Sequence, residues 1–223
     1  MLSLLQLVIA RVPYNAMEGA MLRVAAILLT LVICASIARA DARKDCLQHQ
    51  DPDLTIGTCA AIINDLRGTK QDLIAAYNNR GDAYREKGEY DRAIIDYDKA
   101  IWLDPKSSLT YNNRGNAYND RREYDRAIAD YDKATALEPK YAYPYTGRAR
   151  SYRSQGKYER AISECDKAIA LDPKLAIAYE NRGVTLEDLG RRKEAIADFR
   201  RALSLEPNLK NSKESLKRLE PTP

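Results

Sequence analysis

Apolar residues recur along the chain with the period of a helix, and this pattern itself repeats at a constant interval. The stretch YDRAIIDYDKAI, which begins at Tyr90, carries apolar side chains at its positions 1, 4, 5, 8, 11 and 12. That spacing places them on one face of an α-helix. Upstream, Tyr77 and Tyr84 are seven residues apart and mark one face of an earlier helix, and both recur in the next copy as Tyr111 and Tyr118. The pattern therefore predicts pairs of amphipathic helices.

The helix pair is predicted in four successive copies. An acidic residue followed by proline ends each copy, with the prolines at Pro105, Pro139, Pro173 and Pro207. Proline disfavours helical geometry in the residue before it, so each second helix should end there. Between the helices, Gly88, Gly156 and Gly190 suit a left-handed C-cap. The second copy has Arg122 instead, and we expect its turn to close differently.

Small residues occupy fixed columns of the repeat. One column holds Gly81, Gly115, Ala149 and Gly183, and another holds Ala93, Ala127, Ala161 and Ala195. A glycine inside a helix costs roughly 1 kcal/mol relative to alanine, so some contact must offset that cost. We predict close approach of the two helix backbones, with each glycine facing the alanine of its own copy.

These columns resemble the tetratricopeptide repeat. The first two copies match its motif at Tyr77, Gly81, Tyr84, Ala93, Tyr97, Ala100 and Pro105, and at Tyr111, Gly115, Tyr118, Ala127, Tyr131, Ala134 and Pro139. Ala149 and Cys165 depart from the motif in copy three, and Leu186 departs in copy four. The resemblance covers about residues 74–207 and implies an all-α, right-handed superhelical solenoid. It also assigns the tyrosine columns to helix packing.

The resemblance divides the chain into a leader, an incomplete first repeat, four full repeats and a cap. The expected ranges are 1–40, 41–73, 74–107, 108–141, 142–175, 176–209 and 210–223. In the incomplete repeat, Cys59 aligns with Tyr97 and Cys165. The cap is the helix LKNSKESLKRL from Leu209 to Leu219, because repeat arrays need a polar-faced end for solubility.

The leader, residues 1–40, has the layout of a secretory signal peptide. The positive start Met21–Arg23 precedes an apolar run, Val24–Ala38, and an A-x-A site that ends at Ala40. We expect cleavage after Ala40, a true start at Met21 or Met17, and a periplasmic or secreted protein. The apolar run is shorter than the roughly 20 residues that span a bilayer. An uncleaved anchor stays open, and it would be the only contact with a membrane.

The cysteines fit an exported protein. Cys46 and Cys59 flank an expected turn at residues 50–52, so two antiparallel helices could bring them together. In an oxidising compartment we predict a disulfide, worth about 3 kcal/mol for a loop of this length. Two unrelated free thiols are the alternative. Cys165 lies in a core column and is expected to be a buried, unreactive thiol.

Composition and charge argue against several function classes. The chain has a net charge of +4 with both signs interspersed, and no basic stripe suggests nucleic-acid binding. Its one histidine, His49, has no evident partner, and no spaced metal-ligand set or phosphate-binding glycine loop occurs. Asp96, Asp98 and Asp130 are expected on a solvated helix face. We therefore expect no enzyme, no cofactor and no metal.

The resemblance implies a concave groove, lined by the first helix of each repeat, that holds an extended partner segment. The candidate partner-binding residues are Asn78, Asn79, Asp82, Asn112, Asn113, Asn116, Arg150, Arg153, Glu180 and Asn181. Asn79, Asn113 and Asn181 form one column, broken by Gly147, and each carboxamide can donate to and accept from a peptide backbone. The alternative is that these asparagines bond to neighbouring helices.

We expect a non-enzymatic protein-interaction scaffold whose partner is a protein or peptide. A membrane-anchored structural component of an envelope or secretion assembly is the alternative, and a regulatory subunit of an enzyme is a third possibility. The basic clamp by which heat-shock co-chaperones of this family bind a C-terminal carboxylate does not fit, because Asp82 occupies one of its columns.

Overall fold

The computed structural model describes residues 45–46, 51–65 and 68–220. Over these residues the secondary structure is helical, without strands. The helices are α3 (Pro52–Asn64), α4 (Lys70–Glu86), α5 (Tyr90–Leu103), α6 (Ser108–Asp120), α7 (Tyr124–Leu137), α8 (Tyr143–Ser154), α9 (Tyr158–Leu171), α10 (Ala176–Asp188), α11 (Arg192–Leu205) and α12 (Lys210–Leu219). The leader, with its predicted cleavage site, and His49 lie outside the described residues.

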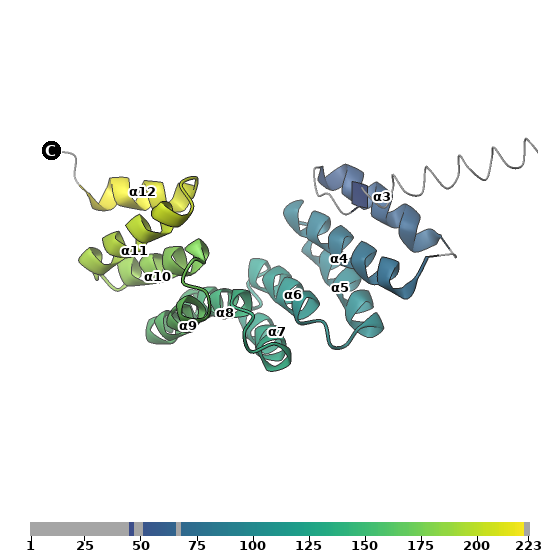
Figure 1. The fold of residues 1–223 in the computed structure, drawn as a ribbon, viewed down its shortest axis with the longest axis horizontal. Coiled ribbons are helices and arrows are strands. Elements are labelled where there is room, and N and C mark those ends of the chain that lie inside the picture. The colour runs from purple at the N-terminus through teal and green to yellow at the C-terminus, as the bar shows by residue number, and fades with distance from the viewer. Residues whose placement is uncertain (1–44, 47–50, 66–67, 221–223) are drawn as a thin grey trace, which may run out of the picture.

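The helices stack in chain order into an arch, with α3 and α12 at the ends of its two arms (Figure 1). Each helix packs against the next, and the first helices of neighbouring repeats, α4, α6, α8 and α10, also contact one another. This arrangement is the all-α solenoid that the repeat pattern predicts. In the described part of the chain, no helix has both the length and the apolar character needed to cross a membrane.

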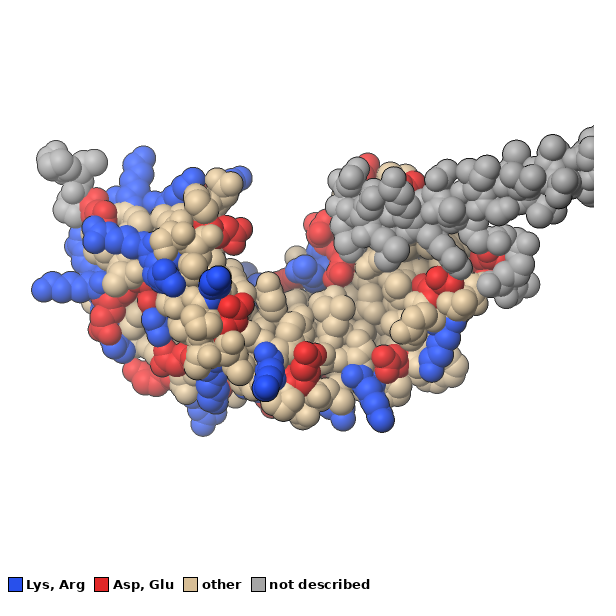
Figure 2. Space-filling model, viewed as in Figure 1, with Lys and Arg blue, Asp and Glu red and all other residues tan. Residues whose placement is uncertain are grey.

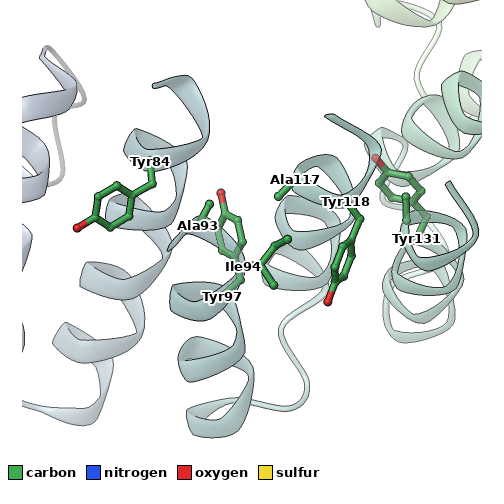
Figure 3. Close-up of a cluster of buried hydrophobic side chains, with 8 residues drawn as sticks. Tyr84, Ala93, Ile94, Tyr97, Ala117, Tyr118 and Tyr131 are labelled. Carbon is green, nitrogen blue, oxygen red and sulfur yellow. The ribbon is translucent and has the colours of Figure 1, made fainter. Parts of the chain in front are cut away.

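In three of the four repeats, a fully buried aromatic ring of the second helix lies against a glycine of the first helix. Figure 3 shows Tyr97 and Tyr131 in this row of buried side chains. A Cβ atom added to Gly81 would come within 2.7 Å of the Tyr97 ring, and one added to Gly115 within 2.8 Å of the Tyr131 ring. The atoms nearest to each of these glycines thus belong to an aromatic ring and not to the alanine that the prediction named. The glycine leaves room for that ring.

The third repeat exchanges both members of this pair. Cys165 stands in the aromatic column and Ala149 in the glycine column, and both are buried in one cluster with Ala161. A thiol is smaller than a ring, so the facing helix has room for a Cβ atom. Burial raises the pKa of the Cys165 thiol to about 12. The side chain is thus a buried, protonated thiol.

The turn of the second repeat closes in the same way as the glycine turns, which corrects the expectation for Arg122. Arg122 has φ 65°, close to 75° at Gly88 and 72° at Gly156. Its backbone N–H donates to Asn119 O at 2.9 Å, as Gly88 N–H does to Arg85 O at 3.0 Å. The arginine therefore adopts the left-handed conformation of a Schellman C-cap, which is costly for a residue with a Cβ atom.

At the N-terminal end, the structure joins Cys46 to Cys59 by a disulfide, with the Cα atoms 5.0 Å apart. Helix α4 begins at Lys70, four residues before the expected start of the first full repeat. Thr69 and Asp72 form a capping box there, because the Thr69 side chain accepts from Asp72 N and the Asp72 side chain accepts from Thr69 N. Relative to its repeat, α4 therefore begins about one helical turn earlier than α6, which begins at the expected position, Ser108.

At the other end, α12 closes the stack. Leu216 and Leu219 pack against the cluster formed by Leu186, Ala195 and Phe199. The Glu180 carboxylate of α10 accepts hydrogen bonds from Ser212 N at 3.2 Å and from Ser212 Oγ at 2.6 Å. The cap is thus held by apolar packing and by a buried carboxylate.

Replacing Gly115 with alanine tests the aromatic–glycine contact. The Tyr131 ring cannot move aside, because Gly147 lies on its other side. A Cβ atom built on Gly147 would be only 2.5 Å from the ring. We expect Gly115→Ala to lose about 1–2 kcal/mol of unfolding free energy in urea denaturation, despite its better helix propensity. Gly57→Ala in α3 is the matched control, since its Cβ would meet nothing within 4 Å. It should gain up to about 1 kcal/mol. Equal effects at both sites would contradict the contact.

Replacing Arg122 with glycine tests the cost of the left-handed turn. Relief of the Cβ clash should outweigh the greater freedom of the unfolded glycine chain, so Arg122→Gly should stabilise by roughly 0.5–1 kcal/mol. The reverse change, Gly156→Arg, should destabilise by a similar amount. Both values come from urea denaturation. The interpretation fails if the two changes shift stability in the same direction.

Candidate functional site: a polar groove on the first helices

The described residues form a groove of about 600 Å³ along the first helices of repeats two to four. Side chains of α6, α8 and α10 line it, together with Arg85 of α4, the loop before α10 and the end of α11. Figure 2 shows the surface dipping between the two arms of the arch, with side chains of both charge signs beside the dip. The groove is therefore polar and carries charged side chains of both signs.

Four of the candidate partner-binding residues line this groove: Asn112, Asn116, Arg150 and Asn181. All four also make hydrogen bonds within the array. Asn116 Oδ1 accepts from the Tyr131 hydroxyl at 2.8 Å, and Asn181 Nδ2 donates to Thr146 O at 3.3 Å. Asn112 is itself buried and donates to the Asn113 side chain at 3.3 Å.

The other candidates lie elsewhere. Asn78 and Glu180 are buried; Asn78 Nδ2 donates to Ile74 O at 3.0 Å, and Glu180 holds α12. Arg153 pairs with Asp188 at 2.7 Å. The remaining candidates, Asn79, Asp82 and Asn113, belong to the first two repeats and lie outside the lining of this groove.

The asparagine column connects repeats in the structure. Asn113 Nδ2 donates to Asp82 at 3.3 Å, just as Asn181 donates to Thr146 of the preceding repeat. Asp82 also accepts from the Tyr97 hydroxyl at 2.6 Å. These bonds match the alternative interpretation of the column, in which the carboxamides serve the packing of neighbouring helices. The amides remain partly exposed.

Several groove residues were not among the candidates: Arg85, Tyr143, Lys174 and Ile177. Tyr143 is 53% exposed and is the most exposed large hydrophobic side chain among the groove residues. A signal for it exists in the sequence, because Leu109, Tyr143 and Ile177 recur at the repeat interval and form an apolar column on the first helices. Asp120 links the two groove arginines, at 3.0 Å from Arg85 and 3.4 Å from Arg150.

A row of ion pairs, each with a buried carboxylate, holds the helices that carry the groove. Arg80 binds Asp96 through two hydrogen bonds of 2.7 and 2.8 Å, and Arg114 binds Asp130 at 2.8 and 2.7 Å. Asp96 and Asp130 are buried, so their assignment to a solvated face is wrong. The same pairing recurs at Arg148–Glu164 and Arg182–Asp198. Asp98, by contrast, is half-exposed as expected.

Each of these arginines after the first also reaches the preceding repeat. Arg114 donates to Asp98 at 2.6 Å and Arg182 to Asp166 at 2.5 Å, and Arg148 pairs likewise with Asp132. Burial would lower the pKa of Arg114, but its bonds to Asp130 and Asp98 outweigh this and raise the pKa. We call the four arginines with their acidic partners the arginine ladder. It connects the second helix of one repeat to the first helix of the next repeat.

Two sequence-family models describe this repeat. The TPR repeat model matches residues 81–120 and 149–190, and the tetratricopeptide repeat model matches residues 108–141 and 176–209. Together they cover more than half of the chain. The chain belongs to the tetratricopeptide repeat family. No protein with a curated description matches it in sequence.

Solved tetratricopeptide structures resemble the array. The first TPR domain of the human RPAP3 protein is 33% identical, with a TM-score of 0.50 over 52% of this chain and 91% of that one. A crystal structure of MamA is 26% identical, with a TM-score of 0.58 over 84% of this chain and 97% of that one. TTC0263, a thermophilic TPR protein of Thermus thermophilus, shares the fold at 16% identity, with a TM-score of 0.66 over 75% of this chain and 90% of that one.

In the described part of the tetratricopeptide array, the histidine, cysteine, aspartate and glutamate side chains do not gather in groups of three or more that could hold a metal ion. The acidic side chains that lie close together instead face arginines of the ladder.

Replacing Arg114 with methionine tests the ladder. The change keeps much of the side-chain length but leaves Asp130 buried without its cation, and we expect a loss of about 3–5 kcal/mol in urea denaturation. Arg92→Met is the control, because Arg92 pairs with Glu89 on the exposed surface and should change stability little. Equal losses in the two variants would mean that the ladder does not hold the repeats together.

Proposed function

We propose that the protein is a non-catalytic scaffold that holds an extended segment of a partner protein in the groove. The observation that carries the proposal is the groove itself, a hollow of about 600 Å³ lined by carboxamides, two arginines and the exposed ring of Tyr143. Hollows of this size accommodate small ligands or several peptide residues. Membership of a family of interaction repeats supports the same function.

The groove chemistry suits a peptide backbone with an apolar anchor. Asn116 and Asn181 are partly exposed and offer amide groups, and Arg150 offers further donors, so they can satisfy the carbonyl and N–H groups of an extended chain. Tyr143 and Ile177 offer an apolar surface in the same groove. Tyrosine and arginine are enriched among the residues that dominate interface energy. We therefore assign the anchor contact to Tyr143.

We place this scaffold in the periplasm. The signal-peptide layout of residues 21–40 supports export, and the Cys46–Cys59 disulfide is typical of an oxidising compartment. The alternative is a membrane-anchored structural component, supported by the apolar run Val24–Ala38. N-terminal sequencing of the protein from its native envelope separates them. A first residue of Asp41 fits the scaffold, whereas a chain that still carries Val24 fits the anchored component.

A peptide selection tests the groove. Phage-displayed peptides are selected on the purified protein, and the affinity of the best binder is measured by calorimetry. We expect Tyr143→Ala and Arg150→Ala each to weaken binding about tenfold or more, because tyrosine and arginine are enriched among the interface residues whose truncation costs about 2 kcal/mol or more. Asp120 keeps its bond to Arg85 in the second variant, so the fold should survive.

Leu171→Ala is the matched control, since Leu171 is also exposed but lies on the second helix α9. It should bind the peptide as the native protein does. Circular dichroism checks that all variants are folded. Peptides that bind all three variants with native affinity would place the binding surface outside the groove.

A further inference from the structure

The outer face of α5 exposes the largest apolar side chains on a second helix. Trp102, the only tryptophan of the chain, is 78% exposed, and Ile95 is 57% exposed. They are seven residues apart, which is two helical turns or about 10.5 Å, so they lie on the same side of the helix. A hollow of about 550 Å³ adjoins them, lined also by Leu73, Tyr77 and Leu103.

The other repeats show that the fold does not need these side chains. The column of Ile95 continues as Ala129, Ser163 and Ala197, and the column of Trp102 as Ala136, Ala170 and Ser204. All four repeats fold alike, although three of them carry small residues at both positions. The apolar pair is therefore particular to the first repeat, and a large exposed apolar surface of this kind marks an interaction site.

The order of residues along this face points to one occupant. Between Ile95 and Trp102 lie Asp98, which is 51% exposed in its side chain, and Lys99, which is exposed. When the order of these four residues is reversed, an apolar residue still stands at each end, and the acidic and basic residues in the middle change places. A helix with this property is complementary to a second copy of itself in antiparallel orientation. Twofold dimers use such self-complementary surfaces.

We propose that the protein forms a twofold dimer in which the outer faces of two α5 helices pack antiparallel. The axis passes between Asp98 and Lys99. Ile95 of each copy then lies opposite Trp102 of the other, and Asp98 lies opposite Lys99. The same register brings Asp91, near the start of α5, toward Lys106, just after its end.

In this dimer the charged residues and the apolar residues contribute to binding in different ways. Asp98 already accepts a bond from Arg114, and its half-exposed carboxylate can meet a second cation. Helix α7 repeats the charges as Asp132 and Lys133 but has alanine at both apolar positions. The charges therefore set the register, and Ile95 with Trp102 supplies the buried apolar area. A different partner protein or a lipid surface would not require the reversal of sign about the centre.

The dimer is independent of the peptide groove. The groove lining comes from other helices and loops than α5, so both surfaces can be occupied at once. The dimer can exist whether or not the groove binds peptides, and failure of either proposal leaves the other standing.

The fluorescence of Trp102 can be used to detect formation of the interface. In sedimentation velocity the purified protein should shift from monomer to dimer with rising concentration. The tryptophan emission should move to shorter wavelength over the same range, because an exposed indole becomes buried. Ile95→Ala/Trp102→Ala should remain monomeric. A native protein that stays monomeric, or a dimer in which the emission does not move, would overturn the proposal.

Cysteine crosslinking tests the register. Lys99→Cys places two thiols beside the axis and should give a covalent dimer on mild oxidation. Lys133→Cys, at the same column of α7, is the matched control and should not. Lys99→Glu should weaken the dimer about tenfold, because it sets two acids opposite each other. Equal crosslinking at both positions would exclude this twofold axis.

Transplanting the apolar pair keeps the test independent of folding defects. Ala129→Ile/Ala136→Trp, made in the monomeric Ile95→Ala/Trp102→Ala background, moves the face to α7, where Asp132 and Lys133 are already present. We expect the dimer to return, with crosslinking now at position 133. A protein that remains monomeric would contradict the assignment of the face as self-complementary.

Discussion

Burial of a carboxylate in each repeat is the constraint on which the rest of the array depends. A carboxylate removed from water must be paired, and here each one meets a partly or fully buried arginine on the first helix of its own repeat. The planar guanidinium group also lies over tyrosine rings, as Arg114 does over Tyr111 at 5.5 Å and over Tyr118 at 5.8 Å. The tyrosine columns therefore pack the helices and at the same time line the site of the arginine cation.

This arrangement explains why the groove can be polar. The ladder joins each first helix to the second helix of its own repeat and of the repeat before it, with bonds such as Arg114–Asp130 and Arg114–Asp98. The opposite side of the first helix is thereby left to line the hollow. Its asparagines and arginines then serve two purposes, since Asn181 bonds to the preceding repeat and also faces the groove.

The period of the sequence was enough to predict the helix pairs, because column identity depends only on spacing. The resemblance to the tetratricopeptide repeat added the solenoid and a groove on the first helices. The direction in which each side chain points is harder to predict. Asn78 and Asn79 are neighbours, yet Asn78 is buried while Asn79 is partly exposed, since one residue turns a helix by about 100°. Asp96 was assigned to solvent for a similar reason. Its burial depends on Arg80, which lies on the preceding helix α4, and local periodicity does not report that pairing. The glycine column was recognised, but its aromatic neighbour is known only from the packed structure.

The ends of the ladder show how the array is terminated. In the alignment that places Cys59 with Tyr97, the position equivalent to Asp98 holds Ala60, which has no charge to leave unpaired beside Arg80. Downstream, the column of Asp98, Asp132 and Asp166 continues with Arg200, and the next position of the arginine column holds Leu216. Every interior arginine has one partner upstream and one downstream at the same separation along the chain, so removing or duplicating a whole repeat would reconnect every charge correctly. The protein could therefore change its length in evolution by whole repeats, while its two end residues continue to close the row.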